Sequence, residues 1–551
     1  MQALKAFVAG LPFLMLATPS PADEFTSTLR FPTYLSGGVP TAHQDPYRTD
    51  SIDVDPSSTF KVTSKTETDY AVAGTVIDDA LGIVYYGFSK NSSDPNLHAY
   101  YLRSENGHSK GQLAWDSSKF GIQLDPCSVL SVNTLDENHN IYFYDCKNLY
   151  SATSDGKLRW KTPLPNSGAV YAEVFLTPTG DVGGITTSGV FGIHNSQTGA
   201  PLTSFFSLPG VYTGGGAFSI SPTEASCIGK TASGGYFTDP LIGFTSARPG
   251  QIQGSAISPS PAIMLDAKDP LLVHVFAIAM MANPTNSAPF DTKLFRVDVQ
   301  YSQSGAIQNA AVASSFDGLI PGGNGSRTAP TIAPNGLEIY VTDTKGGFYA
   351  LSTSTGQILW RQSLGVQIQS PAVSRSLQNL VYAGIGTPKL QVMDPSQAGK
   401  IVVEQDYNSL AVNELPAFQD LPRTAKISTN ILVSPSKLTF TILLGYDVTS
   451  IMGPKNISVD QWPMKSYFVV TDLSGNILSK LALDIAESHA IAPLRGTNQS
   501  GKQQLELYLS SSVYNQSVPY CLKHSHKSQF GYLPEPMVPT GGRVTLSPVT
   551  N

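Results

Sequence analysis

The chain has 551 residues, of which 41% are hydrophobic and 14% are charged, and its formal net charge at pH 7 is −6. The apolar fraction is large enough for an extensive buried core, whereas the charged fraction lies below the ~25% of ordinary soluble domains. The acidic balance and the absence of a basic run argue against a nucleic-acid partner. The 48 glycines and 39 prolines suit an all-β chain that is rich in turns.

The first 22 residues have the layout of a secretory signal peptide. Lys5 precedes the apolar stretch Ala6–Ala17, and Ser20 and Ala22 are small residues at the −3 and −1 positions of a cleavage site. The apolar stretch is too short to cross a bilayer, so we expect no membrane span. We predict a signal peptide at residues 1–22, an N-terminal arm at residues 23–68 and secretion to the extracellular space.

Five Asn-x-Ser triplets agree with export, because this triplet is the acceptor for N-glycosylation in secreted proteins. A polar chain of this length also contains several such triplets by chance. Together with the signal sequence they predict a glycosylated eukaryotic secreted protein. The predicted acceptors are Asn91, Asn324, Asn456, Asn498 and Asn515.

The chain has four cysteines, an even number that is typical of proteins oxidised outside the cytosol. Cys127 opens one predicted strand and Cys146 closes the next, with a polar turn between them. In a hairpin these residues would lie nearly opposite each other, within the ~5.5 Å Cα separation that a disulfide prefers. We therefore predict a Cys127–Cys146 disulfide, and a Cys227–Cys521 disulfide follows by elimination.

The most regular feature is a phrase that occurs twice in full. Residues 346–360 read GGFYALSTSTGQILW, and residues 147–160 read KNLYSATSDGKLRW. Each copy is an alternating strand, a turn closed by Gly and a second strand that ends in Trp. Such a unit, recurring every ~40–50 residues, predicts one blade of a β-propeller, in which the innermost of four antiparallel strands lines a central channel.

Similar units follow one another along residues 69–515, and residues 516–551 form a C-terminal tail. Residues 211–254 fit no unit, and we interpret them as a degenerate blade or a long insertion. The last unit is partial, so we predict an all-β propeller of seven or eight four-stranded antiparallel blades. The predicted units cover residues 73–115, 128–160, 172–199, 261–305, 327–360, 370–403, 427–483 and 489–510.

Closure of the ring is a physical requirement, because an open ring leaves two sheet edges without hydrogen-bond partners. A strand from one terminus can complete the blade at the other terminus. The segment Thr59–Ser64 precedes the first unit and is the candidate for such a strand.

The strand–Thr-Gly–strand–Trp phrase at residues 350–360, and its copy that ends at Trp160, resembles the repeats of the quinoprotein alcohol dehydrogenase-like superfamily. Looser copies at residues 190–202 and 467–478 extend the resemblance over roughly residues 70–510. For the dehydrogenases of the family, the resemblance implies pyrroloquinoline quinone (PQQ) bound with calcium above the channel, a disulfide between adjacent cysteines and a catalytic Asp. This sequence has no adjacent cysteines, and no motif marks the calcium ligands. We therefore expect a member of the superfamily without a recognisable PQQ site. From the predicted secretion and glycosylation we expect a eukaryotic member, and specifically a fungal one.

Three histidines, His524, His526 and His489, are candidates for chemistry, and a fourth, His274, has a structural interpretation. His524 and His526 form the one histidine cluster in the sequence, and with Cys521 they could bind a metal; a solvated tail is the alternative. His489 begins an inner-type strand and is a candidate general base at the channel mouth; a hydrogen-bonded structural histidine is the alternative. His274 lies in the apolar run Leu271–Ala282, where we expect a buried histidine that satisfies a backbone group.

Two functions remain open on the sequence. The leading hypothesis is a secreted binding or scaffold propeller that holds a small molecule, a glycan or a secreted protein at the channel mouth. The alternative is an enzyme on the same scaffold, either a PQQ-type oxidoreductase or a tailoring enzyme of secondary metabolism. We predict no cofactor for the first, and PQQ with calcium for the oxidoreductase.

Overall fold

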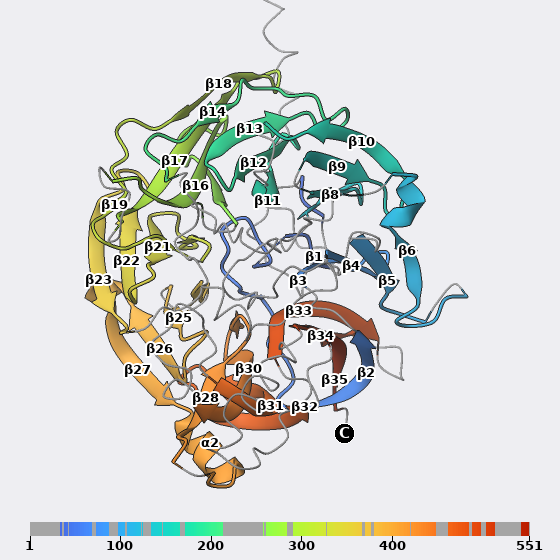
Figure 1. Ribbon diagram of the computed structural model, residues 1–551, viewed down its shortest axis with the longest axis vertical. Coiled ribbons are helices and arrows are strands. Elements are labelled where there is room, and N and C mark those ends of the chain that lie inside the picture. Colours follow the sequence, from blue (N-terminus) through green and yellow to red (C-terminus); the bar gives the residue numbers. More distant parts are fainter. Residues whose placement is uncertain are drawn as a thin grey trace, which may run out of the picture.

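The strands of the computed structural model form eight antiparallel sheets of four or five strands, arranged around a central axis (Figure 1). Each sheet is one blade, so the protein is an eight-bladed β-propeller, and the partial last unit of the sequence is a complete blade. The structure describes residues 33–35, 38–41, 43–68, 73–87, 97–104, 107–122, 124, 134–145, 147–165, 171–212, 257, 260–283, 290–326, 328–365, 370–375, 379–418, 420–447, 461–483, 487–497, 503–512 and 541–549.

Blades 1 to 4 follow the chain from the inner strand to the outer one. Blade 1 contains β1 (Gly38–Val39), β3 (Ala73–Asp78), β4 (Ile83–Gly87), β5 (Leu97–Tyr101) and β6 (Leu113–Asp116). Blade 2 contains β7 (Thr134–Leu135), β8 (Ile141–Tyr144), β9 (Asn148–Ala152) and β10 (Leu158–Pro163). Blade 3 contains β11 (Tyr171–Leu176), β12 (Val182–Thr186), β13 (Val190–His194) and β14 (Phe206–Ser207). Blade 4 contains β15 (Ala262–Leu265), β16 (Leu272–Met280), β17 (Thr292–Tyr301), β18 (Ile307–Val312) and β19 (Leu319–Ile320).

Blades 5 to 7 have the same order, and blade 8 draws its outer strand from the N-terminal arm. Blade 5 contains β20 (Thr331–Ile332), β21 (Glu338–Thr342), β22 (Gly347–Ser352) and β23 (Ile358–Ser363). Blade 6 contains β24 (Ala372–Val373), β25 (Val381–Ala383), β26 (Lys389–Asp394) and β27 (Lys400–Asp406). Blade 7 contains β28 (Arg423–Ile427), β29 (Leu432–Val433), β30 (Lys437–Asp447), β31 (Gln461–Asp472) and β32 (Ile477–Leu483). Blade 8 contains β33 (Glu487–Thr497), β34 (Gln503–Ser512), β35 (Gly541–Pro548) and β2 (Phe60–Thr68).

Helices are few and short among the residues that the structure describes. The 3-10 helices η1 (Ser117–Phe120) and η3 (Pro395–Gln397) follow outer or third strands, and α2 (Asn408–Glu414) connects blade 6 to blade 7. Of the helices in the described ranges, none has the length and apolar character needed to cross a bilayer.

The ring is closed by the N-terminal segment. Strand β2 pairs antiparallel with β35, from Phe60 opposite Pro548 to Thr68 opposite Gly541. The segment expected to close the ring, Thr59–Ser64, overlaps this strand. One blade therefore combines residues from both ends of the chain, and neither end of the ring is left as an open edge.

The innermost strand of blade 2 that the structure describes is β7 (Thr134–Leu135). The strand predicted at residues 128–133 lies outside the described ranges, as do residues 213–256, so that prediction stays as it was. The turn after β7 begins at Asp136, whose carboxylate accepts the backbone N–H groups of Asn138 and Asn140 at 2.9 and 2.8 Å. Such a carboxylate cap stabilises a tight turn and leaves the two preceding residues free to pair in the sheet.

The recurrent Trp and Gly join neighbouring blades at the outer rim. Each Trp lies on the outer strand of one blade, and its ring packs against a turn glycine of the next blade. At all three junctions a Cβ on the glycine would come within 2.7 Å of the indole, so no larger residue fits. The three pairs are Trp115 with Gly156, Trp160 with Gly199 and Trp360 with Gly399.

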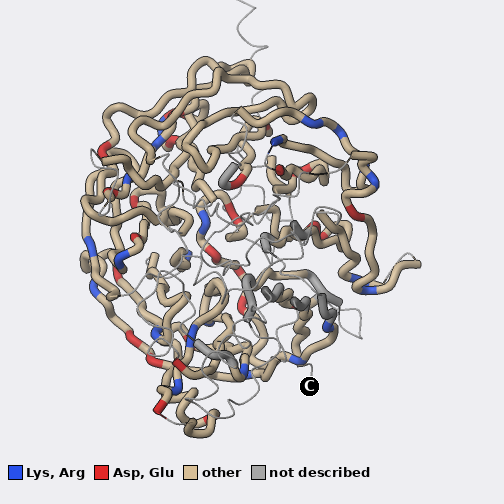
Figure 2. Tube along the Cα trace, in the orientation of Figure 1, with Lys and Arg blue, Asp and Glu red and all other residues tan. Residues whose placement is uncertain are grey.

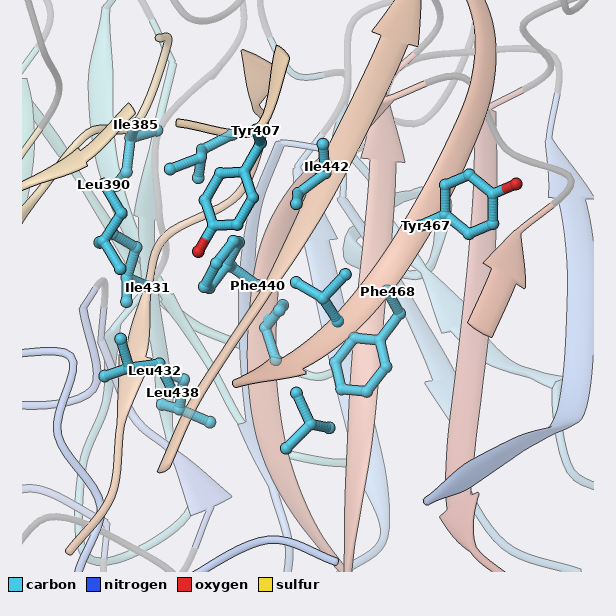
Figure 3. Close-up of a cluster of buried hydrophobic side chains, with 14 of the residues drawn as sticks. Ile385, Leu390, Tyr407, Ile431, Leu432, Leu438, Phe440, Ile442, Tyr467 and Phe468 are labelled. Atoms are coloured by element: carbon cyan, nitrogen blue, oxygen red, sulfur yellow. The ribbon is translucent and has the colours of Figure 1, made fainter. Parts of the chain in front are cut away.

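Apolar side chains fill the spaces between the blades. One cluster spans blades 6 to 8 and includes Leu390 from β26, Phe440 from β30 and Phe468 from β31, all of them buried (Figure 3). Phe60 of β2 joins the same cluster and packs edge-on against Phe468, with ring centroids 5.3 Å apart. Each large side chain buried in this way stabilises the fold by about 1.5–3 kcal/mol. The ring-closing strand is therefore held by packing as well as by its hydrogen bonds.

We expect Gly399→Ala to lower the free energy of unfolding by about 2–5 kcal/mol, since it combines left-handed strain with overpacking. The φ angle of Gly399 is +71°, and a Cβ would lie 2.2 Å from Cε3 of Trp360. The matched control is Gly305→Ala, because Gly305 has a φ of +82° but no atom within 4 Å of a Cβ. The control should lose only about 1–2 kcal/mol in denaturant unfolding. Equal losses in the two variants would contradict a steric role for Trp360.

Candidate functional site

The N-terminal arm occupies the centre of the ring, where a propeller would otherwise have an open channel. In Figure 1 the arm is the blue trace inside the inner strands. The inner strand of a blade has one edge that faces the axis, and the N–H groups on that edge need acceptors. The arm supplies these acceptors to one blade after another.

Six contacts between the arm and the inner strands show this pattern. Short strand β1 of the arm pairs with β3 of blade 1. For blades 2 and 4 to 7, a backbone carbonyl of the arm accepts the N–H group of an inner strand. These bonds run from Leu135 to Pro40 (2.9 Å), Ile263 to Pro46 (2.8 Å), Ile332 to Tyr47 (2.8 Å), Val373 to Thr49 (2.9 Å) and Val433 to Asp50 (2.9 Å).

Apolar side chains of the arm also enter the clusters between the blades. Leu35 joins the cluster of blades 1 and 2, and Tyr34 joins the cluster of blades 2 to 4. Ile52 belongs to the cluster of blades 6 to 8, and Val39 to the cluster of blades 8 and 1. The arm is therefore part of the hydrophobic core of the ring, and we call it the hub of the propeller.

A fully buried ion pair fixes the arm to blade 3. Nη1 of Arg48 lies 3.0 Å from Oε1 of Glu173, and both side chains are 0% exposed. Nε and Nη2 of Arg48 both donate to the carbonyl of Pro261, at 3.1 and 3.0 Å. Thr41 and Ser260 donate hydroxyl hydrogen bonds to the two oxygens of Glu173. Because each charged group has several partners, the pair is stable in an environment without water.

Burial is the main influence on the acidity of this network. It raises the pKa of the Glu173 carboxyl, while the Arg48 guanidinium and the Thr41 hydroxyl oppose that rise. Burial also raises the pKa of Tyr34, whose hydroxyl oxygen accepts the N–H group of Leu176 at 2.9 Å. Figure 2 shows charged residues near the centre of the ring as well as along its rim.

The arm adopts a strained backbone to reach these partners. His43, Gln44, Arg48 and Asp50 all have φ angles between +52° and +70°, in the left-handed region. Each such residue costs about 1–2 kcal/mol, and such strain persists only where surrounding contacts determine the conformation. Two of them bind each other, since Nδ1 of His43 lies 2.6 Å from Oδ2 of Asp50. Asn430 of blade 7 donates to the other oxygen of Asp50 at 2.8 Å.

A cleft of about 410 Å³ lies where the arm leaves the channel. Its walls come from the arm and from the turns that follow the inner strands of blades 5, 6 and 7. One charged pair crosses it, with Nη1 of Arg375 lying 2.8 Å from Oδ1 of Asp53. The cleft has the size of a small-molecule site and sits at the mouth of the channel. Its lining residues are Ser51, Ile52, Asp53, Pro334, Arg375, Val433, Ser434 and Pro435.

The axis of this propeller does not fit the calcium-bound PQQ that the family resemblance implies. The arm fills the space, and the buried carboxylates there already have partners within the chain: Asp45 with Thr49, Asp50 with His43, and Glu173 with Arg48. Among the arm residues that the structure describes, Gln44 is the one buried polar side chain without a hydrogen-bond partner, and one neutral amide is not a ligand set for a quinone and a calcium ion. No group of three or more His, Cys, Asp or Glu that could hold a metal occurs in the described ranges.

Most of the site residues predicted from the sequence lie outside the described part of the chain, so those predictions stay as they were. They are Cys127, Cys146, Cys227, Cys521, His524, His526, Asn91, Asn456, Asn498 and Asn515. His489 lies in β33, where only the backbone is described. Asn324 lies in a loop, where its side-chain oxygen accepts the N–H group of Phe290 at 3.4 Å.

His274 is buried, as expected, but both of its ring nitrogens face carboxylates and not the expected backbone group. Its Nδ1 lies 2.7 Å from Oδ1 of Asp298, and its Nε2 lies 3.1 Å from Oδ2 of Asp266. Both carboxylates belong to blade 4, and Arg296 of β17 also contacts Asp298, at 2.9 Å. This cluster joins strands β16 and β17 and lies away from the axis.

Sequence reasoning missed the residues that shape the axis, namely Arg48, Glu173, Asp53 and Arg375. One signal was available for Glu173. Glu173 precedes Val174 on inner strand β11. The corresponding residue on inner strand β15 of blade 4, which precedes Ile263, is Ala262. A carboxylate at a position where blade 4 has an alanine indicates a buried partner, but nothing local identifies that partner as Arg48.

The fold is similar to solved structures of quinoprotein dehydrogenases. A europium-containing methanol dehydrogenase has a TM-score of 0.51 and 12% identity, over 94% of this chain and 98% of that one. The quinohemoprotein alcohol dehydrogenase of Comamonas testosteroni has a TM-score of 0.52 and 13% identity, over 96% and 84%. BamB of Moraxella catarrhalis has a TM-score of 0.40 and 12% identity, over 89% and 99%. No protein-family model and no curated protein matches the sequence. At these identities the likeness to the dehydrogenases shows a shared fold.

We expect Arg48→Met to lower the free energy of unfolding by about 3–5 kcal/mol, because it leaves the Glu173 carboxylate buried without its partner. The double variant Arg48→Met/Glu173→Leu should recover most of this loss, since it removes both charges. Lys389→Met is the matched control, because the Lys389–Glu404 pair is 44% and 41% exposed. Its effect should be at most about 1 kcal/mol. Additive losses in the double variant, measured by denaturant unfolding, would show that the pair is not coupled.

The His43–Asp50 pair should make stability depend on pH. Burial lowers the pKa of His43, but the charge and hydrogen bond of Asp50 outweigh burial and raise it above 6.5. The protonated histidine therefore stabilises the fold fully below pH 6.5, and this stabilisation is lost as pH rises through the raised pKa. We expect the difference in Tm between wild type and His43→Asn to be largest at acidic pH and to shrink as the pH rises above 6.5 through the raised pKa. A difference that is constant with pH would exclude this role.

Proposed function

We propose that this protein is a secreted binding propeller that holds a small molecule in the cleft at the channel mouth. The observation that supports it is the arm, which fills the axis and leaves a cleft of about 410 Å³ beside its exit. A cleft of this size suits a small molecule better than an extended glycan or a protein surface. It is built from loops on a rigid ring, where binding residues commonly occur.

The cleft has the mixed lining that a small-molecule site requires. Pro334 and Pro435 provide apolar wall, and Arg375 and Asp53 provide charge. The arm side of the cleft is held in place by Asp55, whose carboxylate accepts the hydroxyl of Ser434 at 2.7 Å and the N–H group of Ser436 at 2.7 Å. These contacts keep the cleft open in a defined shape, so little conformational entropy would be lost on binding.

Native mass spectrometry of protein captured from its own secretion medium tests this function. We expect wild type to retain a small molecule and Pro435→Trp to lose it, because Pro435 is an exposed residue of the cleft that a Trp ring would fill. Leu359→Trp is the matched control, since Leu359 is 50% exposed on outer strand β23. It should retain the molecule. Equal retention by both variants would place the ligand elsewhere and overturn the proposal.

The oxidoreductase alternative is tested by adding PQQ and calcium to the purified protein. We expect no thermal shift and no dye-linked oxidation of alcohols or sugars, because the arm takes up the axial space and its carboxylates are already paired. A dehydrogenase that is known to reconstitute serves as the positive control. Saturable PQQ binding with dye reduction would favour the enzyme instead.

A further inference from the structure

Two walls of the cleft meet at a seam between the arm and blade 7. Ser51 and Val433 form a parallel bridge at this seam, and both of them line the cleft. Two backbone hydrogen bonds join the walls: Val433 donates to the carbonyl of Asp50 at 2.9 Å, and Ile52 donates to the carbonyl of Val433 at 2.8 Å. The shape of the cleft therefore depends on whether these two hydrogen bonds are kept.

Asp50 also ends a loop of the arm that begins at His43. The N–H group of Asp50 donates to the carbonyl of His43 at 3.3 Å, and Nδ1 of His43 lies 2.6 Å from Oδ2 of Asp50. Both residues have a φ angle of +52°, so each contributes backbone strain of about 1–2 kcal/mol. The side-chain pair opposes this strain, and it fixes the residue whose carbonyl binds Val433.

The strength of this side-chain pair depends on the charge of His43. The Asp50 side chain is 0% exposed, and a neutral imidazole can give it a hydrogen bond but no counter-charge. Protonation turns the contact into an ion pair, while Asn430 of blade 7 donates to the other oxygen of Asp50 at 2.8 Å. Of the other charged groups in the described ranges, Arg48 of the arm opposes protonation of His43 and Glu173 of blade 3 favours it.

We propose that protonation of His43 locks the seam, so that the cleft holds its molecule in an acidic medium and releases it in an alkaline one. This inference rests on the proposed function and assigns the regulation of the same cleft. Burial lowers the pKa of His43, but the charge and hydrogen bond of Asp50 outweigh burial and raise it above 6.5. The lock is therefore complete below pH 6.5 and is lost as the pH rises through the raised pKa.

Hydrogen–deuterium exchange of the full-length protein, followed by mass spectrometry, tests the lock without a ligand. Peptides that contain Ile52 and Val433 report on the seam, because exchange of their N–H groups requires local opening. We expect the protection factors, which exclude the pH dependence of intrinsic exchange, to fall about 5-fold as the pH rises from below 6.5, as for the loss of an ion pair with one partly exposed partner. An equal fall at Leu135, which donates to Pro40 of the arm near blade 2, would overturn a lock confined to the seam.

Two substitutions test the two partners of the lock. His43→Asn removes the titrating group and should leave the seam weakly protected at every pH. Asp50→Asn keeps hydrogen-bonding atoms at its position but removes the charge, so it should also abolish the pH dependence. Wild-type pH dependence at Ile52 and Val433 in both variants would overturn the proposal.

His139→Asn is the matched control. Nδ1 of His139 also lies 2.6 Å from a buried carboxylate oxygen, Oδ2 of Asp78, and the φ angle of His139 is +62°. This pair joins blades 1 and 2, whereas the cleft lies at blades 5 to 7. The control should keep the wild-type pH dependence at the seam, and its loss there would overturn the assignment to His43.

The lock and the binding function fail in different ways when captured protein is moved into acidic and alkaline buffers before native mass spectrometry. Release of the molecule by wild type only at alkaline pH, with release by His43→Asn at both pH values, supports the lock. Retention by wild type in both buffers, with exclusion by Pro435→Trp, overturns the regulation and leaves the binding function standing. Retention by Pro435→Trp overturns the binding function, and hydrogen exchange at the seam then decides the lock by itself.

Discussion

The structure depends on how the inner edges of eight sheets are satisfied around one narrow axis. Each inner strand turns backbone N–H groups toward that axis, and unpaired groups in such a confined space are costly. The chain solves this with its own arm, whose carbonyls at Pro46, Tyr47, Thr49 and Asp50 serve four successive blades. The buried Arg48–Glu173 pair and the apolar residues of the arm then fix this hub, and the strained backbone of the arm is maintained because so many contacts determine it.

The N-terminal segment has two structural roles, which belong to consecutive parts of the sequence. The described arm residues 38–41 and 43–52 fill the axis, and strand β2, which begins at Phe60, completes blade 8 at the outer rim. The short stretch between them crosses the face of the ring and contributes Asp53 to the cleft and Asp55 to the contacts with blade 7. Ring closure, the filled axis and the candidate site are therefore consequences of the path of one segment.

The likeness to the dehydrogenases concerns the fold and leaves the site open. Their propellers align with this chain over most of its length at 12–13% identity. Identity at this level preserves the packing positions that build blades, while the residues around the axis are free to change. Here those residues bind the arm. Any ligand site is then expected beside the arm, at the mouth, where two charged side chains and two prolines face a defined cleft.

The sequence by itself determined the blades, because Trp115, Trp160, Trp360 and the alternating strands act over short distances or between neighbouring units. The same holds for the candidate ring-closing strand, since an open sheet edge requires a partner and few segments lie outside the units. Only the tertiary structure decided that Arg48 meets Glu173, 125 positions later in the printed sequence, and that Asp53 meets Arg375. Such pairs depend on the path of the arm through the ring, and no periodicity or local spacing encodes that path.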